Sequence, residues 1–254
     1  MFTNESLLSK KHKYPANNDF ERMLGRLPYE NQAILSRVAC EISNSFTFID
    51  SQIQLIKAHN PQLKETKLWD QLSIDAKDIS HFLHDFSTYI HSEQLNTDET
   101  NLIELFTDIV DLSAEKASDK GIDLSILIGE PCLLCLSNYL CDGRKLEQAI
   151  TNVVNWLIDI SEINSAVQIK LPSTEEDFYL HSNGTRYAKI QLSATTTSTM
   201  EDLQDSVYQP VSGNKCVSTN LSMSIAHRII YTHGGGICLE SSDNLLTLNI
   251  YLPV

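Results

Sequence analysis

Two short motifs have residue types and spacing that could support chemistry. Cys132 and Cys135 stand three residues apart, as metal ligands or a redox pair do. Because neither a second cysteine pair nor a nearby histidine completes a zinc site, ordinary reduced thiols are favoured. The string HGGG, His233–Gly236, has the composition of an esterase oxyanion loop. Its place at the end of a helical pattern favours helix capping instead.

The residues on either side of HGGG predict a helix and a strand pair. Apolar residues recur at helical spacing from Leu221 to Thr232, and the glycines end that pattern. Ile237–Glu240 and Leu245–Leu252 are rich in β-branched and aliphatic residues, and the turn-forming sequence Ser-Ser-Asp-Asn separates them. We therefore expect a closing β-hairpin.

Composition and charge exclude several classes of protein. The chain has 254 residues, of which 42% are hydrophobic, enough for one or two ordinary cores. No apolar run approaches the roughly 20 residues that span a bilayer, and the first residues lack an apolar signal core. With 19 basic and 33 acidic residues, the net charge of -14 opposes binding to nucleic acid or anionic lipid. We expect a cytoplasmic protein that neither inserts into a membrane nor binds nucleic acid.

Residues 29–93 are predicted to form an all-α hairpin after a polar tail, residues 1–28. One helix runs from Tyr29 to Asn60, and Pro61 precedes a second that reaches Glu93. Each helix has an apolar stripe with steps of three and four residues. The stripes are Ile34, Val38, Ile42, Phe46, Ile49, Ile53 and Ile56, then Leu68, Leu72, Ala76, Ile79, Leu83, Phe86 and Ile90. Because two helices alone cover such stripes poorly, we expect a homodimer through a four-helix bundle.

Residues 102–254 are predicted to form an α+β domain, a two-layer α/β sandwich joined to the hairpin by a polar linker, residues 94–101. The patterns predict two helices, Leu102–Lys120 and Asp142–Ile160, and a strand, Ile122–Ile128. They also predict a hairpin, Phe178–Ser193, that turns at Asn183-Gly184. We expect the helices to cover one face of a mixed sheet.

These segments resemble two-component sensor histidine kinases. Residues 29–93 are similar to the dimerisation and phosphotransfer hairpin of that family, and residues 102–254 to its ATP-binding domain of the GHKL (Bergerat-like) type. The strongest matches are the strings HRIIYTHGGGICLES and LNIYLPV. The resemblance implies a kinase that moves phosphate from ATP to a histidine on the first helix, and from there to a response regulator.

The acceptor histidine of the family is replaced. Its HExxNP motif corresponds here to VACEISNSF, Val38–Phe46. Cys40 stands at the histidine position, Glu41 matches the neighbouring acid, and Ser45 replaces the proline. A thiol needs activation to act as a nucleophile, and Arg37 is the one basic residue within a turn. We expect Cys40 to point away from the apolar stripe and to be inert.

The family's nucleotide-binding positions are also altered. Asn152 matches the first conserved asparagine, but Trp156 stands at the magnesium-binding position, and an indole does not ligate magnesium. Ala194 replaces the aspartate that would bind adenine. The glycines of the phosphate loop correspond to Ser218, Asn220 and Ser222. We therefore expect an inactive kinase-like protein, a pseudokinase, without a metal or cofactor; Mg-ATP would bind only if this reading is wrong.

A polar and apolar strip on the first helix suggests partner binding. Asn44, Phe48, Ser51 and Leu55 lie away from the apolar stripe, and the matching strip of the family docks the response regulator. We expect a response regulator or a sensor kinase as partner. Two alternatives remain: a divergent kinase that retains ATP binding, or a phosphate relay through a non-standard bundle histidine, the candidates being His59, His81, His84 and His91.

Overall fold

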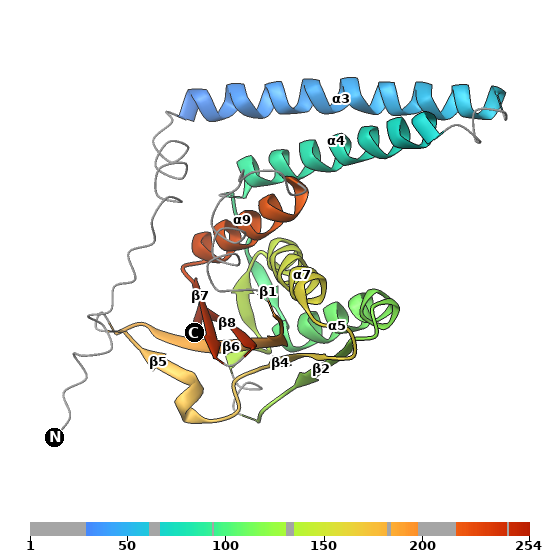
Figure 1. Ribbon diagram of the computed structural model, residues 1–254. Coiled ribbons are helices and arrows are strands. Elements are labelled where there is room, and N and C mark those ends of the chain that lie inside the picture. Colours follow the sequence, from blue (N-terminus) through green and yellow to red (C-terminus); the bar gives the residue numbers. More distant parts are fainter. Residues whose placement is uncertain are drawn as a thin grey trace.

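The structure is a computed structural model that describes residues 29–60, 67–92, 94–130, 135–181, 184–197, 217–242 and 244–254. It consists of a long helical hairpin and an α/β sandwich (Figure 1). The predicted tail, residues 1–28, lies outside the described residues, as do Cys132 of the cysteine pair and Asn183 of the predicted turn. The interpretations of these three features therefore stay predictions.

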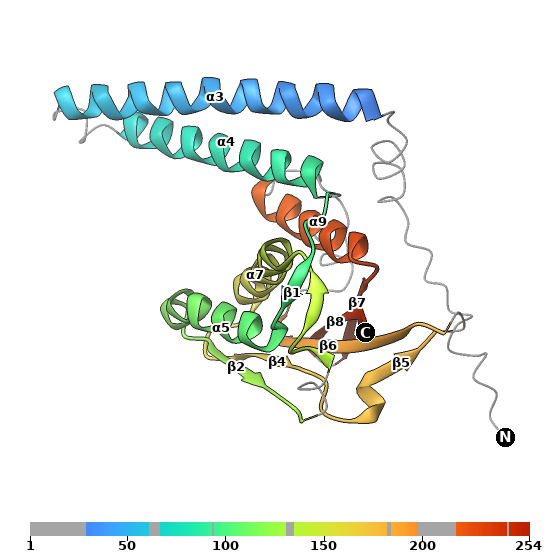
Figure 2. The ribbon, with the colours of Figure 1, turned by 180° about the vertical axis from the view of Figure 1, so that it is seen from behind.

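The predicted hairpin is present, as helices α3 (Tyr29–His59) and α4 (Lys67–His91). The two helices pack side by side, and α4 lies between α3 and helix α9 of the sandwich (Figures 1 and 2). Among the described residues, no helix combines the length and the apolar character that a membrane span requires.

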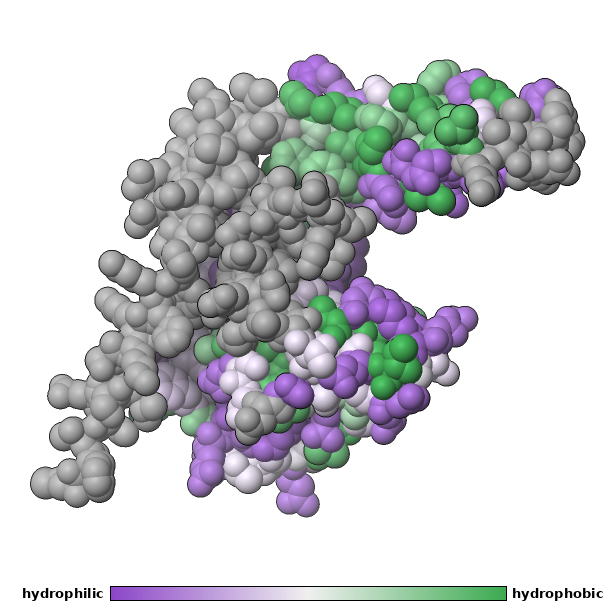
Figure 3. Space-filling view, in the orientation of Figure 1, coloured by the Kyte–Doolittle hydropathy of each residue, from purple (hydrophilic) through white to green (hydrophobic). Residues whose placement is uncertain are grey.

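The apolar stripe of the hairpin is only partly covered within one chain. Ile53, Ala76 and Leu83 are buried. Other members remain between 39% and 46% exposed, namely Val38, Ile42, Ile49, Ile56, Leu72 and Ile79. Figure 3 shows apolar residues gathered over the hairpin. A single hairpin therefore leaves much of its own stripe in contact with water.

The sandwich has three helices on one face of a mixed sheet, as predicted. The helices are α5 (Leu102–Asp119), α7 (Gly143–Ile160) and α9 (Val217–Thr232). The strands run in the order β2-β4-β6-β8-β7, with β5 beside β6. Only β2 and β4 pair in parallel among these strands. Their bounds are Asp123–Leu127 (β2), Ala166–Lys170 (β4), Phe178–Leu180 (β5), Arg186–Thr195 (β6), Gly236–Ser242 (β7) and Leu245–Pro253 (β8).

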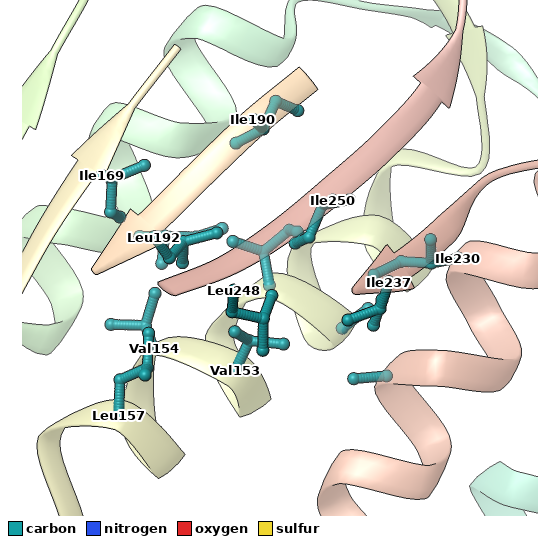
Figure 4. Packing of buried hydrophobic residues seen from close by; sticks show 14 of the residues in the cluster. Val153, Val154, Leu157, Ile169, Ile190, Leu192, Ile230, Ile237, Leu248 and Ile250 are labelled. Atoms are coloured by element: carbon teal, nitrogen blue, oxygen red, sulfur yellow. The ribbon is translucent and has the colours of Figure 1, made fainter. Parts of the chain in front are cut away.

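The core lies between the helices and this sheet (Figure 4). Strand β6 alternates between buried and partly exposed residues, so every second side chain, including Ile190 and Leu192, faces the helices. Val154 and Leu157 of α7 lie on the side of Leu192, and both are fully buried (Figure 4). Burying a side chain of this size contributes about 1.5 to 3 kcal/mol, so the strand alternation and the helix period fix which faces meet.

Two parts of the fold differ from the sequence-based expectation. The predicted linker, residues 94–101, contains strand β1 (Asp98–Thr100), which pairs with β3 (Tyr139–Cys141) and joins the segment to the sandwich. The linker's polar residues carried no strand pattern, and pairing with β3 holds them extended. Helix α9 begins at Val217, four residues before the predicted start. Its first turn therefore includes positions expected in a loop.

The glycines after α9 cap the helix, as predicted. Gly234 has a φ of 77°, a left-handed conformation that favours glycine. The N–H groups of Gly234 and Gly235 donate to the carbonyls of Tyr231 and Ile230, both at 2.9 Å, which is the Schellman arrangement. A Cβ atom on Gly235 would collide with the carbonyl oxygen of Tyr251, so this position also requires glycine.

A buried carboxylate organises the connection between β4 and β5. The Oδ2 atom of Asp177, in the 3-10 turn Glu175–Asp177, accepts hydrogen bonds from the backbone N–H groups of Ser173 and Thr174, at 2.8 and 3.0 Å. Its Oδ1 atom lies 3.5 Å from the Nζ atom of Lys170. Burial acts to raise the pKa of Asp177, but these hydrogen bonds and the nearby charge outweigh it and lower the pKa to about 2.

We expect Asp177→Asn to lower the free energy of unfolding by ~2 kcal/mol at pH 7, since the ionised form is the one that is stabilised. The folded pKa lies below the ordinary value of 3.8, so this stability is present above that value and is lost as the pH falls towards 2. Urea unfolding followed by circular dichroism, from pH 7 to pH 2.5, measures it. The matched control is Glu176→Gln at an exposed neighbour. Equal stability losses in both variants, or a loss for Asp177→Asn that does not change with pH, would contradict the assignment.

Candidate functional site

The position of the family's acceptor histidine lies on the exposed side of α3. Cys40 is exposed, and its Sγ atom lies 3.9 Å from the amide nitrogen of Asn44. The neighbouring acid, Glu41, pairs instead with Arg37, whose Nε atom is 3.2 Å from its Oε1 atom. The hydroxyl of Ser45 donates to the backbone carbonyl of Glu41. The thiol thus has the outward orientation expected of an acceptor, while Glu41 is engaged elsewhere.

The four residues of the predicted docking strip are all exposed on α3. Phe48 is 66% exposed and Leu55 is 52% exposed. Asn44 and Ser51 are exposed beside them. The hydroxyl of Ser51 donates to the carbonyl of Thr47, one turn earlier on the same helix. The strip remains open to a partner in the single chain, and its role stays a prediction.

Trp156, at the position implied for magnesium, belongs to the hydrophobic core. Its side chain is 3% exposed and packs within the cluster that joins α7 to the sheet. Asn152, one turn earlier, donates from its Nδ2 atom to the backbone carbonyl of Ser222 in α9, at 3.2 Å. The two α7 positions that the resemblance connects with nucleotide binding therefore contribute to packing and to a contact between helices.

Ser222 is held from a second side by the hairpin. Its hydroxyl forms a hydrogen bond with the carboxylate of Asp85 in α4. Burial raises the pKa of Asp85, and the nearby His84, His81 and the Ser222 hydrogen bond oppose that rise without cancelling it. The third glycine-equivalent position thus joins α4, α7 and α9.

The other two glycine-equivalent positions, Ser218 and Asn220, lie in the first turn of α9. Their side chains fall outside the described part of the structure. Their backbone is helical, whereas the resemblance implied a loop over the phosphates. Helix α9 begins before these residues, so they form part of the helix and not a loop.

Ala194, at the adenine-binding position, is a fully paired strand residue. It is 1% exposed and stands opposite Val167 of β4 and Leu246 of β8. Beyond it the chain stays extended, and the N–H group of Thr196 donates to the carbonyl of Asn244 at 2.9 Å. The methyl side chain offers no hydrogen-bond acceptor to a base.

The bundle histidines differ in their surroundings. The Nδ1 atoms of His59 and His91 lie 2.8 and 2.7 Å from backbone carbonyls one turn earlier in their own helices. His81 and His84 are exposed on α4, one turn and one residue before Asp85, and their charges act on its carboxylate. In the part of the chain that the structure describes, no three His, Cys, Asp or Glu residues gather as a metal site would require.

The sequence analysis missed one polar cluster, where the hairpin meets the sandwich. Asp142, Lys145 and His233 come together there from α7 and from the end of α9. The one signal in the sequence is the place of Asp142 just before a helical pattern, which is typical of an N-cap. Nothing in the sequence connects that aspartate with a histidine 91 residues later.

Comparison with known proteins gives related chains but no matching family model. Sporulation kinase E of Bacillus subtilis (strain 168) is 21% identical over 219 residues, which are 85% of this chain and 28% of the relative. The sensory histidine kinase/phosphatase NtrB of Vibrio alginolyticus is 24% identical over 155 residues, 60% of this chain and 42% of the relative. The chain is a homologue of sensor histidine kinases.

Solved histidine-kinase structures share the fold of both parts. Full-length ShkA, solved in complex with AMPPNP, has a TM-score of 0.68 and 14% identity, with 88% of this chain and 45% of that chain covered. The histidine kinase AdeS of Acinetobacter baumannii has a TM-score of 0.52 and 15% identity, with 83% and 95% covered. The predicted helical hairpin followed by a GHKL-type domain is therefore confirmed. The chain spans less than half the length of either curated relative.

We expect Trp156→Ala to destabilise the histidine-kinase fold by about 3 to 5 kcal/mol, because removing a buried indole leaves a cavity. Chemical denaturation followed by far-ultraviolet circular dichroism measures the change. Tyr231→Ala is the matched control, since Tyr231 is an aromatic residue of the sandwich that is 71% exposed. An unchanged unfolding curve for Trp156→Ala would show that the indole fills no space in the core.

Proposed function

We propose that this chain is a catalytically inactive histidine-kinase homologue that acts in two-component signalling by binding a response regulator or a partner kinase. One observation carries the proposal: a buried indole, Trp156, stands where the family's magnesium ligand is expected. Magnesium requires oxygen ligands in near-octahedral geometry, and an indole supplies none.

The contacts around Trp156 support the same conclusion. Asn152 uses its amide to bind α9, and Ser222 is engaged by both Asn152 and Asp85. Phosphate loops depend on glycines because backbone N–H groups must approach the phosphates closely. Here the equivalent positions carry side chains in place of glycine, and Ser222 lies beyond the first turn of α9, where its backbone N–H group is committed to a helical hydrogen bond. The described residues therefore do not fit Mg-ATP.

The phosphate acceptor is also unsuited to its family role. Cys40 stands at the histidine position, and the neighbouring acid, Glu41, forms an exposed surface pair with Arg37 on its own helix. A thiol becomes a good nucleophile only as the thiolate, which requires a positive or basic neighbour at the sulfur. The atom that lies beside Cys40 is a neutral amide nitrogen of Asn44.

We expect isothermal titration of the purified chain with Mg-ATP to give no detectable heat at millimolar ATP. The physical reason is the loss of the metal, base and phosphate contacts together. An active histidine kinase, titrated in the same buffer, is the control. Saturable heat with this chain would contradict the proposal and favour the alternative of a divergent kinase that retains ATP binding.

We also propose that the chain forms a homodimer through residues 29–93. The support is the apolar stripe, several members of which remain about two-fifths exposed in one hairpin. A second hairpin with the same stripe can cover these residues and complete a four-helix bundle. Since burial of apolar surface contributes about 25 cal/mol per Å², an exposed stripe of this length favours pairing.

The partner surface that we propose is the strip of Asn44, Phe48, Ser51 and Leu55. It lies on α3, while the sandwich contacts the hairpin through α4 and α9. The strip and the sandwich therefore do not compete for the same helix. Large apolar side chains at seven-residue spacing suit the apolar face of a partner helix or loop.

We expect Phe48→Asp to weaken binding of the cognate response regulator at least tenfold, because a charge would be buried in an apolar contact. Surface plasmon resonance measures the affinity. Leu112→Asp is the matched control: Leu112 is a similarly exposed residue, at 70%, but lies on α5. Undiminished binding by Phe48→Asp would remove the docking assignment.

The adjacent residue separates docking from dimerisation. Phe48→Asp should leave the dimer intact, whereas Ile49→Asp, on the apolar stripe, should yield monomers in size-exclusion chromatography with light scattering. If both variants stay dimeric, the stripe is not the dimer contact. If both become monomeric, Phe48 belongs to the dimer contact and not to a partner surface. Transfer of phosphate from a phosphorylated regulator to the chain would instead indicate the relay alternative.

A further inference from the structure

A cluster of polar contacts fastens the end of the hairpin to the sandwich. The Nζ atom of Lys145, in the first turn of α7, donates to the backbone carbonyl of His91 at 2.8 Å and also to that of Gln94. These carbonyls lie at the C-terminal end of α4 and just beyond it. The end of a helix carries partial negative charge and unsatisfied carbonyls, so a lysine there stabilises α4 in this position.

Asp142 holds the segment that follows α4. Its Oδ1 atom accepts from the backbone N–H group of Lys145 at 3.1 Å, and thereby caps α7. Its Oδ2 atom accepts from the backbone N–H group of Asn96 at 2.9 Å. Burial acts to raise the pKa of Asp142, but the hydrogen bonds from Asn96 and Lys145 outweigh it and hold the pKa below its ordinary value.

The backbone of Asp142 is held in turn by His233, at the end of α9. The N–H group of Asp142 donates to the Nε2 atom of His233 at 3.1 Å. The Nδ1 atom of the same ring lies 2.8 Å from the carbonyl oxygen of Ile229. Because a carbonyl can only accept, the proton of the ring must be on Nδ1, and Nε2 must be bare. This geometry therefore requires a neutral imidazole.

Contacts between α4 and α9 continue this junction along the helices. Tyr89 of α4 is 1% exposed, and the guanidinium carbon of Arg228 in α9 lies 4.5 Å above the centre of its ring. One turn earlier on α4, Asp85 binds the hydroxyl of Ser222. Such a cation-π contact is attractive, because the face of the ring carries partial negative charge. The junction is thus extensive, and His233 is positioned at its end.

We propose that Asp142, Lys145 and His233 form a proton-sensitive latch that fixes the sandwich to α4 while His233 is neutral. Protonation would place a second ring proton at Nε2, directly against the N–H group of Asp142, and the hydrogen bond would be lost. The closed latch ties the end of α4 and the segment around Asn96 to the first turn of α7. This inference goes beyond the proposed function and does not depend on whether the chain binds ATP.

The charges around His233 set the direction of the pH dependence. Burial disfavours the imidazolium; the Asp142 carboxylate attracts it and the Lys145 ammonium repels it. The net effect is a pKa of His233 below its ordinary value of 6.5. The unfolded or opened state therefore takes up a proton first, so the latch holds above pH 6.5 and weakens as the pH falls below it.

Hydrogen exchange of the full chain, measured by mass spectrometry at pH 7.5 and pH 5.5 and corrected for the intrinsic rate, tests the latch. The reporter is the segment 94–98, which contains the N–H group of Asn96, and the reference is strand β4. We expect protection of the reporter to fall between the two pH values, by at most about tenfold per pH unit for one proton, while β4 keeps its protection. Loss of protection in both segments together, or in neither, would overturn the proposal.

Variants identify the residues responsible. His233→Gln should keep the protection of 94–98 at pH 7.5 and abolish its pH dependence, because the amide oxygen can accept from Asp142 but does not titrate. Lys145→Met should lower protection of 94–98 at both pH values, and Lys145→Arg should restore it. Lys120→Met is the control, since Lys120 pairs with Asp159 elsewhere on the sandwich. Unchanged pH dependence in His233→Gln, or unchanged protection in Lys145→Met, would refute the latch.

Discussion

The burial of α9 is the constraint on which most of the structure depends. Most described side chains of this helix are apolar or small and are buried, on nearly every side of the helix. The sheet, α7 and α4 each contact it. A helix of this kind is stable only when neighbours enclose it. Consequently α9 packs against both the sandwich and the hairpin and joins these two parts of the fold.

This packing explains how a histidine-kinase homologue can keep its fold while its site positions change. Trp156 fills the core, and Asn152 and Ser222 join α7 to α9. Each of these side chains contributes to stability in its present place. The proposed role in partner binding uses the opposite part of the molecule, the outer side of α3.

Elements with a strong hydrophobic period were predictable from the sequence. The hairpin helices, α7, β6 and the closing hairpin of β7 and β8 were all expected close to their observed places. Strands β1, β3 and β4 were missed: β1 and β3 have three residues each, too few to display a period, and β1 consists of polar residues only. The early start of α9 was missed since Ser, Thr and Asn have low helix propensity. For the candidate site, the resemblance to the family predicted which positions to examine, but not the contacts that their side chains make. The contacts of Ser222 with Asp85 and Asn152, and of Asp142 with His233, join residues far apart in the chain, and no local pattern encodes them.

Strand β8 lies between β6 and β7, so the last strand of the sequence occupies the interior of the sheet. During synthesis, residues 245–253 must leave the ribosome before the sheet can close, whereas the hairpin needs only contacts within residues 29–91. Local contacts form faster than such long-range pairings. The hairpin helices can therefore pair with each other before the sheet of the sandwich closes.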